Sequence, residues 1–182
     1  MSKDTLARRF DEADLSEDRF VKVKDGVKAC LDHDSRWSDP RDVPGQNYGI
    51  YCDEDDQLVI LDVDYHREGT DDISTVALSA LDGLPLTLKL QSPHVPDGDR
   101  GGHMVFKLAG DEPPAELFSR VFAKKNPVPS WGEVISKNKF VVGTGSQLDG
   151  CNKDWCEDCA EAEKGWYTIK KDREIATVEA EM

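Results

Sequence analysis

The sequence predicts an α+β fold in which a mixed β-sheet carries flanking helices. Short segments whose apolar residues alternate with polar ones, which is typical of strands, recur along the chain. Other segments place apolar residues every three or four positions, as on one face of a helix. We find no internal repeat and no linker long enough to separate domains, so we expect one domain over residues 1–182.

The first third of the chain predicts one helix and three strands. Residues 4–15 are rich in helix-forming side chains and carry apolar residues at helical spacing. Residues 20–24 alternate apolar and basic residues, as a strand does. Residues 48–52 and 58–64 are two apolar runs separated by an acidic turn, which predicts a β-hairpin.

The middle of the chain predicts two more strands, each near a helix. Residues 71–81 have a helical pattern, and in residues 86–91 every second residue is leucine, which predicts a strand with one buried face. Residues 103–107 form another strand after a polar loop. Residues 113–123 carry a core-facing apolar stripe behind a proline suited to the first helical turn.

The C-terminal third predicts short strands on both sides of a polar loop. Residues 133–142 predict two short strands, and residues 166–169 predict a closing strand. The segment between them, at about 147–164, is polar and rich in cysteine. We expect it to be a loop.

The charge of the chain limits its possible partners. It has 37 acidic and 23 basic residues, with a formal net charge of -14 at pH 7. Such a chain repels nucleic-acid phosphates in ordinary buffer, but at ~1 M salt the Debye length falls to roughly 3 Å and the repulsion largely disappears. A halophilic origin would therefore reconcile this charge with nucleic-acid binding. A protein that avoids nucleic acid is the alternative, and charge does not choose between them.

Composition also indicates the compartment. No apolar run approaches the roughly twenty residues needed to cross a bilayer, and the N-terminus lacks the apolar core of a signal peptide. We expect a cytoplasmic protein without a membrane partner. Five cysteines, an odd number in a chain without an export signal, predict reduced thiols or metal ligands rather than disulfides.

Two carboxylates end the most hydrophobic run of the sequence. Asp62 and Asp64 follow residues 58–61, and the two-residue period of a strand puts both on one face. In a chain this acidic, two acids at that spacing should recur about seven times by chance, so spacing alone is weak evidence. A carboxylate at the end of an apolar strand is costly without a partner, however. The pair therefore predicts a site for hard divalent cations such as Mg²⁺.

Further polar residues stand near predicted strand ends. His103 and Lys107 share one face of a strand that begins after two glycines, and together they could hold a triphosphate. A solvated or hydrogen-bonded histidine is an equally open interpretation of His103. Glu133 starts an apolar strand and offers a third metal ligand, unless it is an ordinary surface glutamate. The small-residue turn that ends at Ser146 would let a phosphate or ribose approach.

Taken in order, these motifs resemble the N-terminal catalytic domain of the bifunctional primase-polymerase (Prim-Pol) family, within the archaeo-eukaryotic primase superfamily. Residues 47–64 look like the family segment that ends in two metal-binding acids. Residues 92–94 and 101–106 are similar to its glycine-histidine strand, and residues 131–146 to its third motif. The resemblance covers roughly 20–169. It departs from the family in an expanded loop at 94–100 and in the absence of a helicase phosphate-binding motif.

The resemblance implies a function and a set of roles. It implies an RRM-like catalytic core and template-directed nucleotidyl transfer by a DNA primase/polymerase. Asp62, Asp64 and Glu133 would hold Mg²⁺ or Mn²⁺ in a two-metal site. His103 would be catalytic and would hold the incoming nucleotide with Lys107 and Ser146, about a nucleotide's length from the carboxylates. The implied partners are a DNA template, NTPs or dNTPs and a separate replicative helicase. The implied source is a halophilic archaeon, a virus or a plasmid.

A cysteine cluster predicts a structural metal. Cys151, Cys156 and Cys159 lie in a stretch too polar to form its own core, and zinc would hold it together. Structural zinc takes four ligands, so a fourth is required. Candidates for that ligand are His94, Cys52 and Cys30. The alternative is a set of reduced thiols on a loop.

Two other functions remain open from the sequence. One is a non-catalytic, zinc-containing nucleic-acid-binding module of a replication complex, which the missing helicase motif and the cysteine loop would suit. The other is a metal-dependent nuclease or phosphoesterase, since the acids and His103 could also activate water.

Overall fold

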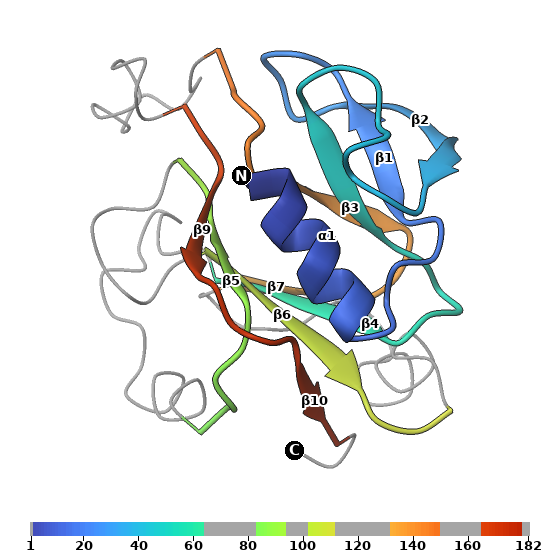
Figure 1. The fold of residues 1–182 in the computed structure, drawn as a ribbon, viewed down its shortest axis with the longest axis vertical. Helices are drawn as coiled ribbons and strands as arrows, with labels where there is room; N and C mark the ends of the chain where they lie inside the picture. The colour runs from blue at the N-terminus through green and yellow to red at the C-terminus, as the bar shows by residue number, and fades with distance from the viewer. Residues whose placement is uncertain (1, 64–82, 94–101, 112–131, 150–164, 180–182) are drawn as a thin grey trace.

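The computed structural model describes residues 2–63, 83–93, 102–111, 132–149 and 165–179 (Figure 1). These residues form two β-sheets and one helix, α1 (Ser2–Glu12). The four-stranded sheet has the order β2 (Cys30–Trp37), β1 (Phe20–Val23), β3 (Tyr48–Cys52) and β8 (Lys139–Val142). The six-stranded sheet has the order β7 (Gly132–Ile135), β4 (Leu58–Val63), β6 (Gly102–Leu108), β5 (Lys89–Gln91) and β9 (Thr168–Lys171), with β10 (Ala176–Val178) beside β6. The β10–β6 pair is parallel, and the other pairs are antiparallel.

The β3–β4 and β7–β8 connections each carry the chain from one sheet to the other. β3 pairs with β1 and β8, whereas β4 pairs with β6 and β7. In the same way, β7 belongs to the six-stranded sheet and β8 to the four-stranded sheet. Because β8 pairs antiparallel with β3 and β7 pairs antiparallel with β4, the β3–β4 segment runs antiparallel to the β7–β8 segment. The predicted hairpin of residues 48–52 and 58–64 is therefore wrong. Its acidic turn changes sheets, and both strands take partners that are distant in sequence.

Asp56 fixes the turn between β3 and β4. Its carboxylate accepts hydrogen bonds from the backbone amides of Leu58, at 2.5 Å, and Asp53, at 3.2 Å. It also pairs with the Arg19 guanidinium at 3.0 Å. Arg19 is only 4% exposed. Burial raises the pKa of Asp56, and the charge of Arg19 opposes that rise.

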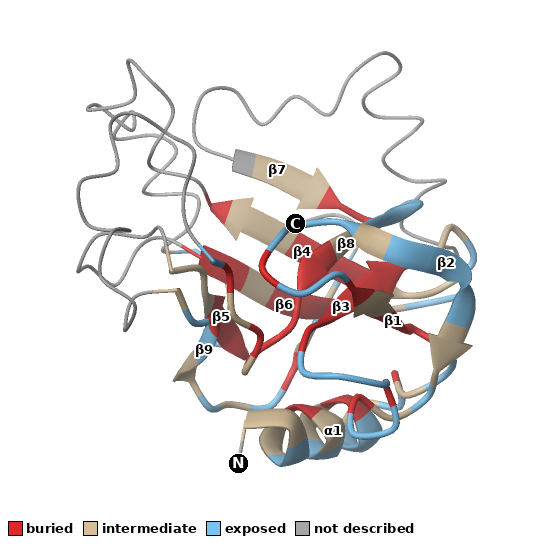
Figure 2. Ribbon diagram, turned by 90° about the horizontal axis from the view of Figure 1, so that it is seen from above, coloured by how far each residue is buried: buried red, intermediate tan, exposed pale blue. Residues whose placement is uncertain are grey.

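The main hydrophobic core takes side chains from α1 and from both sheets. α1 buries Leu6 and Phe10, and the Phe10 ring meets Phe20 of β1 edge to face, with 5.5 Å between ring centroids. Figure 2 shows the buried side of α1 turned toward the strands. The helix therefore covers the inner face of the strands that carry the predicted site.

The six-stranded sheet has a distinct residue set on each face. Ile60 and Val105 belong to the main core, so they point to the inner face. Val59 and Phe106 belong to a second cluster on the outer face. Because side chains alternate along a strand, every second residue from Ile60 or Val105 also lies on the inner face.

The prediction of an α+β fold is confirmed in a coarser form: the described elements are mostly strands, with a single helix, and they make two sheets rather than one. The helix predicted at 4–15 is present as α1. Each predicted strand overlaps an observed one, but the strand predicted at 86–91 is present only as β5, and Leu86 is exposed rather than buried. Two strands, β2 and β10, were not predicted. The predicted helices at 71–81 and 113–123 lie outside the described residues, so the RRM-like core stays a prediction.

No helix within the described ranges is long and apolar enough to cross a membrane.

Candidate active site

Three predicted site residues stand side by side on neighbouring strands. In the register of the sheet, Asp62 of β4 is opposite His103 of β6 on one side and Glu133 of β7 on the other. Asp62 is two residues from Ile60 and His103 is two from Val105, so both lie on the inner face. Directly opposed side chains have Cβ atoms about 4.5–5.5 Å apart. We call Glu133, Asp62 and His103 the inner row.

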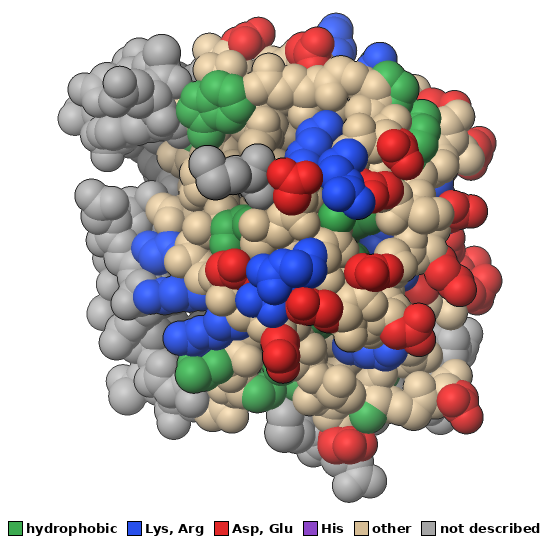
Figure 3. Space-filling view, viewed as in Figure 1, with side chains coloured by type: hydrophobic (Ala, Val, Ile, Leu, Met, Phe, Trp, Pro, Cys, Tyr) green, Lys and Arg blue, Asp and Glu red, His purple; other side chains and the backbone are tan. Residues whose placement is uncertain are grey.

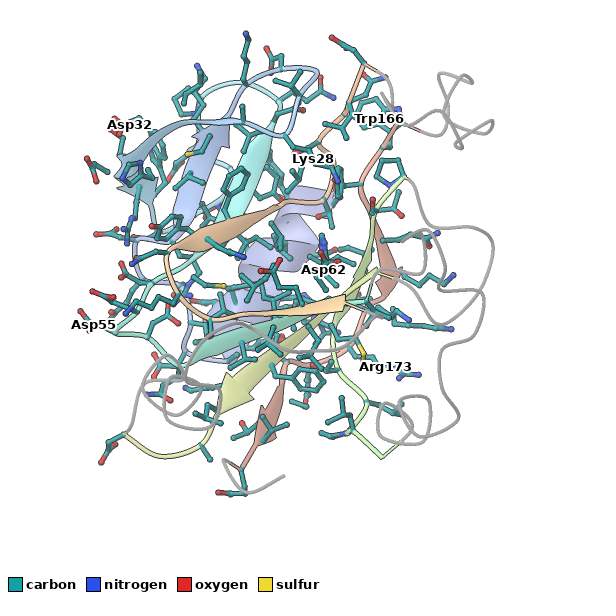
Figure 4. The ribbon with its side chains drawn as sticks, turned by 180° about the vertical axis from the view of Figure 1, so that it is seen from behind. Lys28, Asp32, Asp55, Asp62, Trp166 and Arg173 are labelled. Atoms are coloured by element: carbon teal, nitrogen blue, oxygen red, sulfur yellow. The ribbon has the colours of Figure 1, made fainter. Side chains whose placement is uncertain are left out.

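Asp62 and His103 are in contact. Nε2 of His103 lies 3.3 Å from Oδ1 of Asp62, closer than the nucleotide's length expected from the sequence. His103 is 6% exposed, whereas about a third of the Asp62 side chain, 34%, is exposed. In Figure 4, Asp62 lies in the middle of the molecule between the two sheets. The pair thus joins a buried imidazole to a carboxylate that solvent and ligands can reach.

Gly102 is required by the backbone beside His103. Its φ is +108°, and a Cβ at this position would lie 2.2 Å from the carbonyl oxygen of Leu90 on β5. Any larger side chain would push β6 away from β5. The glycine therefore lets the two strands meet at the point where β6 presents the imidazole.

Tyr167 and Lys28 complete the surroundings of His103, and the sequence did not point to either. The Tyr167 ring stacks on His103, with 6.3 Å between centroids and planes 18° apart. Burial raises the pKa of the Tyr167 hydroxyl, while the charge of Lys28 and hydrogen bonds with Lys28 and Ser92 lower it, and the charge of Asp62 raises it further. No local sequence pattern predicts these two residues, because they come close to His103 only through contacts between segments that are distant in the sequence.

Glu133 is engaged by a lysine from the other sheet. Its carboxylate pairs with the ammonium of Lys139 on β8. Within the described part of the chain, no three His, Cys, Asp or Glu side chains form a group that could hold a metal ion. Asp64, the other predicted ligand, lies outside the described residues. The metal roles of Asp62, Asp64 and Glu133 therefore stay predictions.

Lys107 and Ser146 have partners in the structure other than the inner row, and the Ser146 carbonyl accepts the backbone amide of Tyr167 at 2.9 Å. Lys107 lies four residues beyond His103, or ~13 Å along the strand, where its ammonium donates to the carbonyl of Ala13 at 2.8 Å. The Ser146 hydroxyl is fully buried and bonds the backbone amide and carbonyl of Tyr48. In these positions Lys107 contacts the residues that follow α1, and Ser146 holds its turn against β3. Their nucleotide-binding roles stay predictions.

The cysteine cluster lies outside the described residues, as does His94. Of the other two proposed zinc ligands, Cys52 is a free thiol in the hydrophobic core, and burial raises its pKa well above the ordinary value. Cys30 is a partly exposed free thiol on β2. Burial thus disfavours Cys52 as the fourth ligand, because zinc binds the thiolate.

A comparison with protein families shows the family of the chain. The family model described as bifunctional DNA primase/polymerase, N-terminal, matches residues 11–176. The chain belongs to the Prim-Pol family. The Prim-Pol domain is accordingly a DNA primase/polymerase, a nucleotidyltransferase of a family that depends on divalent metal and uses DNA and nucleotides as substrates. This confirms the resemblance seen in the sequence. No curated protein matches the chain.

Proposed function

We propose that this Prim-Pol domain performs template-directed nucleotidyl transfer at the inner row, by a two-metal mechanism that also uses Asp64. The observation that supports it is the register of β7, β4 and β6, which sets Asp62 directly between Glu133 and His103. Three polar side chains from three motifs, distant in sequence, thus occupy one line on one face. If these three residues were ordinary surface side chains, nothing would require them to be neighbours on the same face of the sheet.

The donor set suits a hard divalent cation. Asp62 and Glu133 offer carboxylate oxygens on adjacent strands, and Asp64 follows Asp62 at the spacing that keeps it on the same face. Lys139 now supplies a positive charge against Glu133. When bound, Mg²⁺ or Mn²⁺ would neutralise charge that develops on the phosphates as a 3′-hydroxyl attacks the α-phosphate.

The protein side chains contribute position. Asp62 and Tyr167 hold the imidazole of His103 from two sides, one by the 3.3 Å contact and the other by stacking. A side chain held in this way loses little freedom when substrate binds, and such preorganisation lowers the barrier. His103 is therefore suited to orient the nucleotide next to the carboxylates.

One experiment separates the three functions that the sequence left open. Wild type and an Asp62→Asn/Asp64→Asn variant receive labelled template, NTPs or dNTPs, and Mg²⁺ or Mn²⁺. Metal-dependent incorporation by wild type that the variant lacks supports the proposal. Shortened DNA without incorporation would instead identify a nuclease, and binding that is unchanged in the variant, without reaction, a non-catalytic module.

Three further expectations stay predictions alongside this function. Their only support is the sequence: cysteine spacing for zinc on Cys151, Cys156 and Cys159, the family resemblance for a helicase partner, and composition for a cytoplasmic location. Metal analysis of the purified protein, before and after mutation of Cys156, tests the zinc. One zinc per chain is expected in wild type and less in the variant.

A further inference from the structure

Lys28 lies near the inner row, although the strands on either side of it in the sequence belong to the other sheet. It lies in the connection between β1 and β2, and its ammonium is 5.8 Å from the centre of the Tyr167 ring. It hydrogen-bonds with the Tyr167 side chain, which also stacks on His103. Figure 4 labels Lys28 above Asp62, on the same side of the molecule. The Tyr167 ring therefore lies between the Lys28 ammonium and the imidazole of His103.

The loop that carries Lys28 is held in place. The amide of Asp149 donates to the carbonyl of Gly26 at 3.0 Å, and the amide of Lys24 donates to the carbonyl of Ala29 at 2.8 Å. Gly26 has a φ of +77°, and a Cβ there would lie 2.0 Å from the Asp149 carboxylate. The close contact with Asp149 thus holds the backbone two residues before Lys28 in place.

The site needs positive charge for a triphosphate, and the other lysines discussed lie elsewhere. The protein carries a net charge of -14, and the inner row itself contains two carboxylates. Lys139 is engaged with Glu133, and Lys107 contacts Ala13 and lies 3.9 Å from Asp14. Lys28 has an exposed side chain, and its ammonium lies over the Tyr167 ring that stacks on His103. Its positive charge therefore lies on the His103 side of the molecule, close enough to be tested as a phosphate contact.

We propose that Lys28 binds the phosphates of the incoming nucleoside triphosphate and that Tyr167 positions it beside His103. This inference rests on the proposed nucleotidyl transfer and names a binding residue for it. Lysine acts here as a point charge on phosphate, as it does in other nucleotide sites. The contact made by its ammonium would pass from the Tyr167 hydroxyl to a phosphate oxygen.

The test compares Lys28→Ala and Lys28→Arg with wild type, and Lys24→Ala, in an exposed lysine of the same connection, is the matched control. Binding of ATP, dATP and deoxyadenosine is measured by calorimetry without template, and incorporation kinetics are measured separately. Lys28→Ala should weaken triphosphate binding and raise KM about tenfold, with kcat within about threefold and nucleoside binding unchanged. Lys28→Arg should restore most of the affinity, and Lys24→Ala should match wild type.

Equal triphosphate affinity in wild type and Lys28→Ala would overturn the proposal, as would an equal loss of nucleoside binding. These results are independent of the proposed function, because binding is measured without catalysis. If wild type binds triphosphate through Lys28 but incorporates nothing, nucleotidyl transfer fails and the phosphate site stands. If incorporation depends on Asp62 but not on Lys28, nucleotidyl transfer stands and the phosphate-binding role of Lys28 fails.

Discussion

At the scale of single residues, Gly102 connects the backbone of the sheet with the chemistry of the site. Its positive φ and the nearby Leu90 carbonyl leave no room for a Cβ. Gly110, which follows the end of β6, also has a positive φ, +90°, but a Cβ added there would meet no atom within 4 Å. Substitution of Gly110 should therefore cost stability through backbone conformation alone, whereas substitution of Gly102 should add the cost of a steric clash.

We predict that Gly102→Ala lowers the free energy of unfolding by about 3 kcal/mol or more, since conformational strain and overpacking add. Gly110→Ala should cost only about 1–2 kcal/mol, from conformation alone. Urea unfolding of both variants measures the difference. Equal losses would mean that the β5–β6 contact is looser than described.

The sequence predicted one part of the site and missed another. Asp62 and His103 could be found because each stands in a distinctive local context, at the end of an apolar run or after two glycines. Tyr167 and Lys28 could not, because their place beside His103 depends on how β9 and the β1–β2 connection pack, which no local pattern records. Lys107 and Ser146 were assigned from local pattern and from the family resemblance, and their contacts with Ala13 and Tyr48 leave those roles as predictions.

At the scale of elements, the turn between β3 and β4 decides the architecture. Periodicity correctly located both strands, because a strand's burial is a local property of its residues. It paired them wrongly, because the hairpin prediction considered only neighbours in sequence. β2 was missed since its residues are mostly exposed, with burial on neither face, and β10 since it is short and pairs in parallel with β6.

The same turn gives a prediction on stability. Asp56→Ala leaves the Arg19 guanidinium buried without its carboxylate and frees two backbone amides. We expect a loss of about 3–5 kcal/mol in the free energy of unfolding, as for one partner removed from a buried ion pair. The matched control is Asp55→Ala, an exposed neighbour in the same turn, which should change stability by no more than about 0.5 kcal/mol.

Thermal or urea unfolding decides this prediction. Similar free energies of unfolding for the Asp56 and Asp55 variants would show that the ion pair with Arg19 does not stabilise the turn between β3 and β4.

At the scale of the whole molecule, charge dominates. Figure 3 shows acidic side chains spread over the surface, with lysines and arginines among them. A net charge of -14 opposes the compact state through self-repulsion, which salt screens. The halophilic source expected from this charge stays a prediction, but its physical basis can be measured.

We predict that raising NaCl from about 0.1 M to about 1 M increases the melting temperature at pH 7, because the Debye length shrinks from roughly 10 Å to 3 Å. Near pH 4.6, the isoelectric point of the sequence, the net charge is close to zero and the same salt step should have little effect. Differential scanning calorimetry at both pH values measures this. An equal increase at both would assign the stabilisation to general salting-out instead.

If the inner row is a catalytic centre, template-directed incorporation must depend on Asp62, and the rate measured with Asp62→Asn shows whether it does. Asp55→Asn, an exposed aspartate just before β4, controls for the loss of one negative charge. With melting temperatures equal to wild type, Asp62→Asn should lower the rate at least ~100-fold and Asp55→Asn should leave it unchanged. A folded Asp62→Asn variant that incorporates nucleotides at the wild-type rate would show that the inner row is not the catalytic centre.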